Sequence, residues 1–241
     1  MKSSGSWPRA ETKVMPMRTF SAGGKTVSVS PAAQPGAPVL YLNAVSGEAA
    51  EEVLRAVRAA GCPPVTLVTI CGLDWNRDLT PWDSPAVLRG GAPFTGGASA
   101  YLRLLAEHIV PEAERGLHRP RWRGLAGYSL AGLFAVYALY QTNLFSRAGS
   151  MSGSLWFPGF LEYVRSHTPV RQPDRLYFSL GDRESRTRSR VLQTVQQNTQ
   201  EIEALFRNQN VDTVFCLHPG NHFDHAAART AAGIAWLLDN P

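Results

Sequence analysis

The chain has 241 residues, of which 44% are hydrophobic and 18% are charged, so it is long enough to bury the core of a globular enzyme. Its net charge of +5 comes from scattered residues, apart from one group of arginines between positions 183 and 190. Aromatic side chains do not alternate with these arginines as a nucleic-acid groove requires, and no apolar run is long enough to span a bilayer. These features argue against a nucleic-acid-binding protein and against a membrane protein.

The N-terminal region predicts a flexible leader, and the rest of the chain predicts one domain. Residues 1–13 lack the apolar segment of a signal peptide, and residues 14–241 contain no internal repeat or domain boundary. Cys62, Cys71 and Cys216 are odd in number and do not have metal-ligand spacing. We interpret them as buried, reduced thiols, which suit a reducing compartment. The sequence therefore predicts a cytoplasmic protein without a metal site.

Along the chain, a hairpin precedes a regular alternation of strands and helices. Two short apolar runs, residues 14–20 and 25–30, flank Gly23-Gly24, and glycine supplies the positive φ that a hairpin turn needs. The following alternation predicts a mostly parallel, twisted sheet with helices on both faces. The expected strands are 38–43, 65–71, the short run before Gly127, 145–151, 175–180 and 211–217. The expected helices are 48–60, 98–116, 130–140, 160–167, 188–208 and 226–239.

The stretch from Gly127 to Ala131 has the pattern of a nucleophile elbow. Gly127 and Ala131 are small residues two positions before and after Ser129, and larger side chains there would collide with the neighbouring strand and helix. Such a turn lifts the serine hydroxyl clear of the sheet and points the first N–H groups of the next helix toward it. The alternative is that Ser129 only caps the helix that begins near Leu130.

A serine nucleophile needs a base, and the base needs an acid that orients it. His222 lies in the loop after the last expected strand and is our candidate for the base. Asp182 and Glu184 both follow Gly181, at the end of the preceding strand. We favour Glu184 because of its longer reach, and Asp182 stays as the alternative because an aspartate beside glycine commonly stabilises a turn. The order serine, acid, histidine is that of an α/β-hydrolase, which is the fold we predict.

The backbone around the serine also predicts two donors for an oxyanion. The N–H of Leu130, at the start of the helix, is expected to be the first donor. The second is expected from the loop after the first central strand, where the backbone N–H of Ala44 or Val45 is suitable.

Three residues in the neighbouring loops, Trp156, Trp75 and Arg77, are expected to line a substrate pocket. The long loop 72–97 supplies two of them, and loops of that length are usually functional when they are ordered. The alternatives are that the tryptophans cover the core and that Arg77 pairs with Asp78.

Several motifs give the chain a resemblance to a known family. They are Val39-Leu40-Tyr41-Leu42, Arg77-Asp78-Leu79-Thr80-Pro81, the stretches 127–135 and 150–156, Gly181-Asp182-Arg183-Glu184 and Gly220-Asn221-His222-Phe223. In these motifs the chain resembles the esterase branch of the α/β-hydrolases, which contains enterochelin esterases, S-formylglutathione hydrolases and feruloyl esterases. The resemblance implies that Ser129 is the nucleophile, that His222 is the base and that Glu184 is the acid. The chain departs from the family at Asn43-Ala44, where members often carry Asp-Gly.

The predicted function is that of a serine esterase without a metal or organic cofactor. It would cleave a small-molecule acyl ester or lactone through an acyl-enzyme on Ser129, and the resemblance includes siderophore lactones among the substrates. We expect a monomer or a homodimer. The alternatives are an acyltransferase that uses the same residues and a non-catalytic binding protein on a hydrolase fold.

Overall fold

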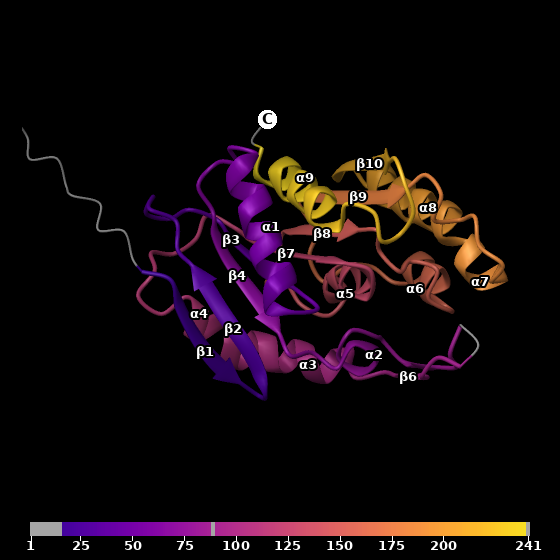
Figure 1. Cartoon of the computed structure of the whole chain (residues 1–241), viewed down its shortest axis with the longest axis horizontal. Helices are drawn as coiled ribbons and strands as arrows, with labels where there is room; N and C mark the ends of the chain where they lie inside the picture. The colour runs from indigo at the N-terminus through magenta and orange to yellow at the C-terminus, as the bar shows by residue number, and fades with distance from the viewer. Residues whose placement is uncertain (1–15, 88–89, 240–241) are drawn as a thin grey trace, which may run out of the picture.

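The computed structural model describes residues 16–87 and 90–239, so the predicted leader, residues 1–13, lies outside the described part. An eight-stranded sheet runs through the molecule in the order β1-β2-β4-β3-β7-β8-β9-β10 (Figure 1). Its strands are β1 Arg18–Ala22, β2 Lys25–Ser30, β3 Val39–Asn43, β4 Thr66–Cys71, β7 Arg123–Tyr128, β8 Arg147–Met151, β9 Arg175–Gly181 and β10 Asp212–His218.

The direction of the strands confirms the predicted α/β-hydrolase architecture. β1 and β2 form the antiparallel hairpin, β2 pairs antiparallel with β4, and the strands from β4 to β10 across the sheet run parallel. Parallel strands are buried on both faces, which agrees with the complete burial of β3, β8 and β9. The carboxyl ends of β3, β7, β9 and β10 therefore meet at one edge of the sheet, where ligands bind in open α/β sheets.

Helices cover both faces of the sheet. On one face α1 and α9 lie side by side, and α3, α4, α5, α6 and α8 pack on the opposite face (Figure 1). α1 buries Ala50, Val53 and Val57, a spacing that places them on one side of the helix. The helices are α1 Gly47–Ala59, α2 Trp75–Asp78, α3 Ala98–Leu104, α4 Val110–Ala113, α5 Leu130–Ala138, α6 Phe160–Ser166, α7 Arg190–Gln193, α8 Val195–Asn208 and α9 Ala226–Leu238.

Two of the expected helices are interrupted. The helix predicted over 98–116 contains a π-helical turn, Leu105–Ile109, between α3 and α4. Pro111 follows two residues later, and because proline has no N–H and crowds the carbonyl of the preceding turn, the wider turn accommodates it. The helix predicted over 188–208 is divided into α7 and α8 at Thr194.

The long loop 72–97 is held by short elements and a buried ion pair. It contains α2 and a small antiparallel pair, β5 Asp83–Ser84 and β6 Phe94–Thr95. The ammonium group of Lys25, on β2, donates a hydrogen bond to the carboxylate of Asp78, and both side chains are less than a tenth exposed. This contact ties the loop to β2, and removing either partner would leave a buried charge unpaired.

Two smaller expectations concern the thiols and the membrane. Cys62, Cys71 and Cys216 are free, as expected, but they are half-buried rather than buried. Among the described helices none is long and apolar enough to cross a bilayer.

Candidate active site

Ser129 lies at a strained turn between β7 and α5. Its φ of 59° and ψ of −125° are rare for a residue with a side chain and match the elbow that the small neighbours predict. A Cβ atom on Gly127 would lie 2.6 Å from the backbone carbon of Ala131, so the close packing of β7 and α5 requires glycine there. Ser129 occupies the N-cap position, but its hydroxyl accepts no capping hydrogen bond from α5. The side chain is thus directed away from the helix.

The imidazole of His222 lies between the serine and a carboxylate. Its Nε2 is 3.1 Å from Oγ of Ser129, and its Nδ1 is 2.8 Å from Oε2 of Glu184. The three residues are separated by 93 and 38 positions and come from the ends of three different strands. The structure therefore brings together the three side chains that the sequence proposed as nucleophile, base and acid.

Glu184 is buried and held in one orientation. Its Oε1 accepts hydrogen bonds from the backbone N–H of Gly181 at 2.6 Å and from the hydroxyl of Ser152 at 2.7 Å, which leaves Oε2 for the imidazole. Burial raises the pKa of the Glu184 carboxyl, but the hydrogen bonds from His222 and Gly181 outweigh it and hold the pKa below its ordinary value. The residue is consequently an anion that faces the imidazole.

Asp182, the alternative acid, does not contact His222. Its Oδ1 accepts a hydrogen bond from the N–H of Gly220 at 2.9 Å, and its side chain is half-exposed. It joins the loop after β9 to the loop that carries His222, which is the turn-stabilising role expected of an aspartate beside glycine.

Three residues that the sequence did not single out complete the surroundings of Ser129, His222 and Glu184. Arg229, on α9, is 2% exposed and donates hydrogen bonds to Oε1 of Glu184, to the hydroxyls of Ser152 and Tyr128, and to the Pro219 carbonyl. Ser152 has a φ of 45°, which turns its hydroxyl toward Glu184. The Tyr128 hydroxyl donates to the carbonyl of His222 at 2.7 Å. An arginine buried in an otherwise apolar helix is the one signal that could have pointed to them.

The backbone hydrogen bonds near Ser129 contradict one of the predicted oxyanion donors, the N–H of Ala44. The N–H of Ala44 donates to the carbonyl of Ile70 at 2.9 Å, which extends the pairing of β3 with β4, so it is not free to bind an oxyanion. The N–H of Val45, the other candidate, has no acceptor within the described chain. The N–H of Leu130 is the first of α5 and has no intrahelical acceptor.

A pocket of 310 Å³ opens beside Ser129 and His222. Of the three residues predicted to line it, two do not. Trp75 lines it as expected. Trp156 instead packs against Phe94, with ring centroids 6.1 Å apart, and covers the core. Arg77 pairs with Asp78 at 3.0 Å and holds the long loop. The remaining pocket walls come from Leu42, Asn43, Ala44, Val45, Ala49, Glu52, Val53, Tyr128, Phe223, Ala226, Ala227 and Thr230.

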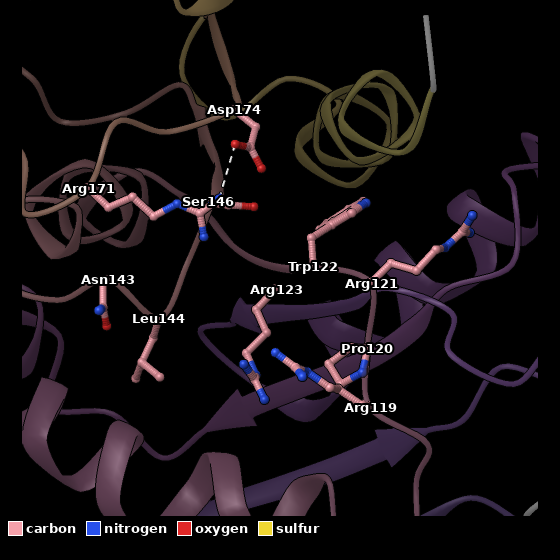
Figure 2. A pocket seen from close by; sticks show the side chains of 10 residues that line it. All are labelled: Arg119, Pro120, Arg121, Trp122, Arg123, Asn143, Leu144, Ser146, Arg171 and Asp174. Carbon is pink, nitrogen blue, oxygen red and sulfur yellow. Dashed lines mark hydrogen bonds and ion pairs between the residues drawn. The ribbon is translucent and has the colours of Figure 1, made fainter.

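A second cavity, of 440 Å³, lies at the opposite edge of the sheet, near the start of β7 and β8 (Figure 2). Arg119, Arg121, Arg123 and Arg171 surround it, and the ion pair between Arg171 and Asp174 spans one side. None of the residues that line it belongs to the group around Ser129. This cavity is therefore separate from the candidate active site.

The described residues give no indication of a metal site. Within residues 16–87 and 90–239, no three His, Cys, Asp or Glu side chains are grouped so that they could hold a metal ion.

The site has a serine at a strained strand-to-helix turn, and a carboxylate and an imidazole follow it along the chain at later strand ends. On a sheet of this topology, that arrangement defines an α/β-hydrolase. The family model described as "Putative esterase" matches residues 32–226. The chain therefore belongs to the Putative esterase family.

Individual proteins resemble the chain at low sequence identity. The uncharacterized protein YbbA of Bacillus subtilis (strain 168) is 24% identical over 144 residues, which are 58% of this chain and 58% of that protein. The chain thus matches little more than half the length of this relative.

Solved structures extend the likeness to almost the whole chain. An IroE-like serine hydrolase from Shewanella oneidensis has a TM-score of 0.77 at 20% identity, covering 92% of this chain and 80% of that one. The siderophore hydrolase EstB from Aspergillus nidulans has a TM-score of 0.74 at 19% identity, covering 98% and 97%. At these identities the likeness establishes the fold.

Proposed function

We propose that the protein is a serine esterase in which Ser129 is the nucleophile, His222 the general base and Glu184 the acid that orients the imidazole. Nδ1–H of His222 donates to Glu184, so Nε2 carries a lone pair directed at the serine hydroxyl. Nε2 takes the proton as Oγ attacks the ester carbonyl carbon, and the anionic Glu184 stabilises the imidazolium that forms. The ester oxygen then leaves with that proton as an alcohol.

The acyl-enzyme that results is hydrolysed by the same groups. His222 takes a proton from water, the hydroxide attacks the acyl carbon, and the imidazolium returns the proton to Ser129 as the carboxylic acid leaves. In both steps the negative charge on the carbonyl oxygen is stabilised by the backbone N–H groups of Leu130 and Val45. In the resting protein a hydrogen bond of 3.3 Å also links Oγ of Ser129 with the hydroxyl of Ser154.

The observation that carries this proposal is the continuous hydrogen-bonded series Ser129–His222–Glu184. Its geometry favours catalysis over a purely binding role, because a binding protein has no need for a carboxylate buried behind an imidazole. The side chain of His222 is 29% exposed, so water can reach it, which favours hydrolysis over acyl transfer.

A siderophore lactone is the second candidate substrate, after a simple small ester. The names of structural neighbours support it, since EstB is a siderophore hydrolase and another neighbour is an enterobactin hydrolase. A pocket of 310 Å³ is of the size that small-molecule ligands use. A panel of p-nitrophenyl esters, feruloyl esters and trilactone siderophores separates these candidates by their kcat/KM values.

Covalent labelling tests the proposal. The protein is incubated with a fluorophosphonate probe and assayed with p-nitrophenyl acetate and butyrate. We expect turnover that the probe abolishes, with the label on Ser129 and neither label nor turnover in Ser129→Ala. Absence of both in the wild-type protein would contradict the proposal and favour a non-catalytic binding role.

A further inference from the structure

The pocket beside Ser129 is a groove between α1 and α9. Ala49, Glu52 and Val53 face it from α1, at a spacing of three and four residues that places them on one side of the helix. Ala227 and Thr230 face it from α9. Figure 1 shows these two helices side by side above one face of the sheet. A substrate bound at Ser129 therefore extends along the side of α1.

The side chains lining this groove are mainly apolar, and its mouth is apolar as well. Phe223, next to His222, is 87% exposed, and Val45 is 68% exposed, although both are large apolar residues that are usually covered. Their position at the pocket suits them to contact the apolar part of a substrate.

Glu52 is the exception, and its charge is uncompensated. It is the one carboxylate among the described residues that line the groove, and no lysine or arginine is among them. Its neighbour Glu51 pairs with Arg55 at 3.9 Å, whereas Glu52 forms no ion pair with any residue in the described part of the chain. Glu52 is exposed, so water screens part of its charge, but a carboxylate at a protein surface still interacts more strongly with a nearby ligand charge than the same pair does in bulk water.

We propose that Glu52 selects the charge of the substrate, so that the enzyme prefers esters with a positively charged group and disfavours esters with an anionic group. This inference rests on the proposed esterase function. A cationic group beside Glu52 gains an opposite charge, whereas an anionic group meets a like charge and finds no lysine or arginine in the groove. Glu52 is thus a specificity-determining residue that takes no part in the chemical step.

Three thioesters that differ mainly in charge test this inference: cationic acetylthiocholine, its neutral isostere 3,3-dimethylbutyl thioacetate and anionic S-acetyl-3-mercaptopropionate. The thiol that each releases is followed with a chromogenic disulfide. We expect kcat/KM to fall from the cationic to the neutral to the anionic ester by about fivefold at each step at low ionic strength. The differences should shrink in about 0.5 M salt, which screens exposed charges.

Substitutions on α1 assign the preference to one carboxylate. Glu52→Gln should reduce the differences, and Glu52→Lys should reverse the order. Glu51→Lys is the matched control, because it makes the same change of net charge one residue away, at a position that does not line the groove. We expect it to leave the order unchanged.

The possible failures of the two proposals are distinguishable. If the neutral ester is turned over but Glu52→Lys changes the three kcat/KM values equally or not at all, the role of Glu52 is wrong and the esterase function stands. A reversal by Glu51→Lys as large as that by Glu52→Lys also contradicts it. If no thioester is turned over and the fluorophosphonate does not label Ser129, both proposals are wrong.

Discussion

Nη1 of Arg229 lies 3.3 Å from Oε1 of Glu184, and both side chains are almost completely buried. The two residues are 45 positions apart, one on α9 and the other in the loop after β9. The same guanidinium also contacts Tyr128, beside Ser129, and Pro219, close to His222. One buried cation therefore links the segments that carry the serine, the acid and the histidine.

Replacing Arg229 should destabilise the protein strongly. Arg229→Met leaves Glu184 as a buried anion with one contact fewer and removes hydrogen bonds to three other groups, so we expect a loss of about 3–5 kcal/mol in the free energy of unfolding. Urea denaturation followed by tryptophan fluorescence measures it. Arg186→Met, on the surface, is the control with the same change of charge. A loss below about 1 kcal/mol for Arg229→Met would show that the guanidinium is not an essential link.

The identity of the acid can be decided by two matched amide substitutions. Glu184→Gln keeps the shape but removes the charge that faces the imidazole, and we expect kcat to fall by about 10²–10⁴. Asp182→Asn changes a half-exposed side chain that contacts the Gly220 N–H, so its kcat should stay within about threefold of wild type. Steady-state kinetics with p-nitrophenyl butyrate distinguishes them. The reverse pattern would assign the role of acid to Asp182.

The lowered pKa of Glu184 predicts how stability depends on pH. Because the pKa in the folded state lies below the ordinary value of 4.5, ionised Glu184 contributes stability above that value, and the contribution is lost as the pH falls through the folded-state pKa. The difference in unfolding free energy between wild type and Glu184→Gln should therefore shrink from about pH 5 to about pH 3. A difference that is constant over this range would mean that the carboxyl is not titrating with a lowered pKa.

The buried pair of Lys25 and Asp78 should matter more than the exposed pair beside it. Asp78→Asn leaves the ammonium of Lys25 buried without a counter-charge, and we expect a loss of about 3–5 kcal/mol in the free energy of unfolding. Asp74 pairs with Arg77 at 3.6 Å with both side chains half-exposed, so Asp74→Asn should cost less than about 1 kcal/mol. Thermal and urea unfolding measure both variants. Equal effects would contradict the assigned role of the buried pair.

The close approach of β7 and α5 predicts that Gly127 tolerates no side chain. In Gly127→Ala the new methyl group would lie within 3 Å of the backbone of Ala131, so the elbow must shift. We expect a loss of about 1–3 kcal/mol in stability together with a fall in kcat. Gly47→Ala, at the start of α1, where a methyl group meets nothing within 4 Å, is the control and should be neutral. Normal kcat in Gly127→Ala would show that the elbow can adjust.

Two predictions drawn from the sequence remain to be measured. Whether the protein is a monomer or a homodimer is decided by sedimentation equilibrium, and whether it lies in the cytoplasm by fractionation of cells that produce it.

The parts of the fold and site that local chemistry dictates were predictable from the sequence. Gly23-Gly24 identified the hairpin because few other residues allow its turn, and the small residues around Ser129 identified the elbow because only they fit it. His222 and Glu184 were identified as well, because parallel strands carry their carboxyl ends to a common edge. These signals lie within a few residues of the feature that they predict.

What lay outside the reach of the sequence depends on how distant segments pack. Ala44 pairs with Ile70, Trp156 turns to Phe94, and Arg229 reaches Glu184 only because α9 folds back over β8 and β9. Glu52 likewise lies on a helix that the sequence identifies, but only the placement of α1 against α9 brings it to the pocket. The sequence alone determined which residues could carry the chemistry, since backbone sterics and the alternation of strands and helices along the chain are local properties. Only the tertiary structure decided which neighbours hold and surround them, because those contacts arise from packing between elements that are remote along the chain.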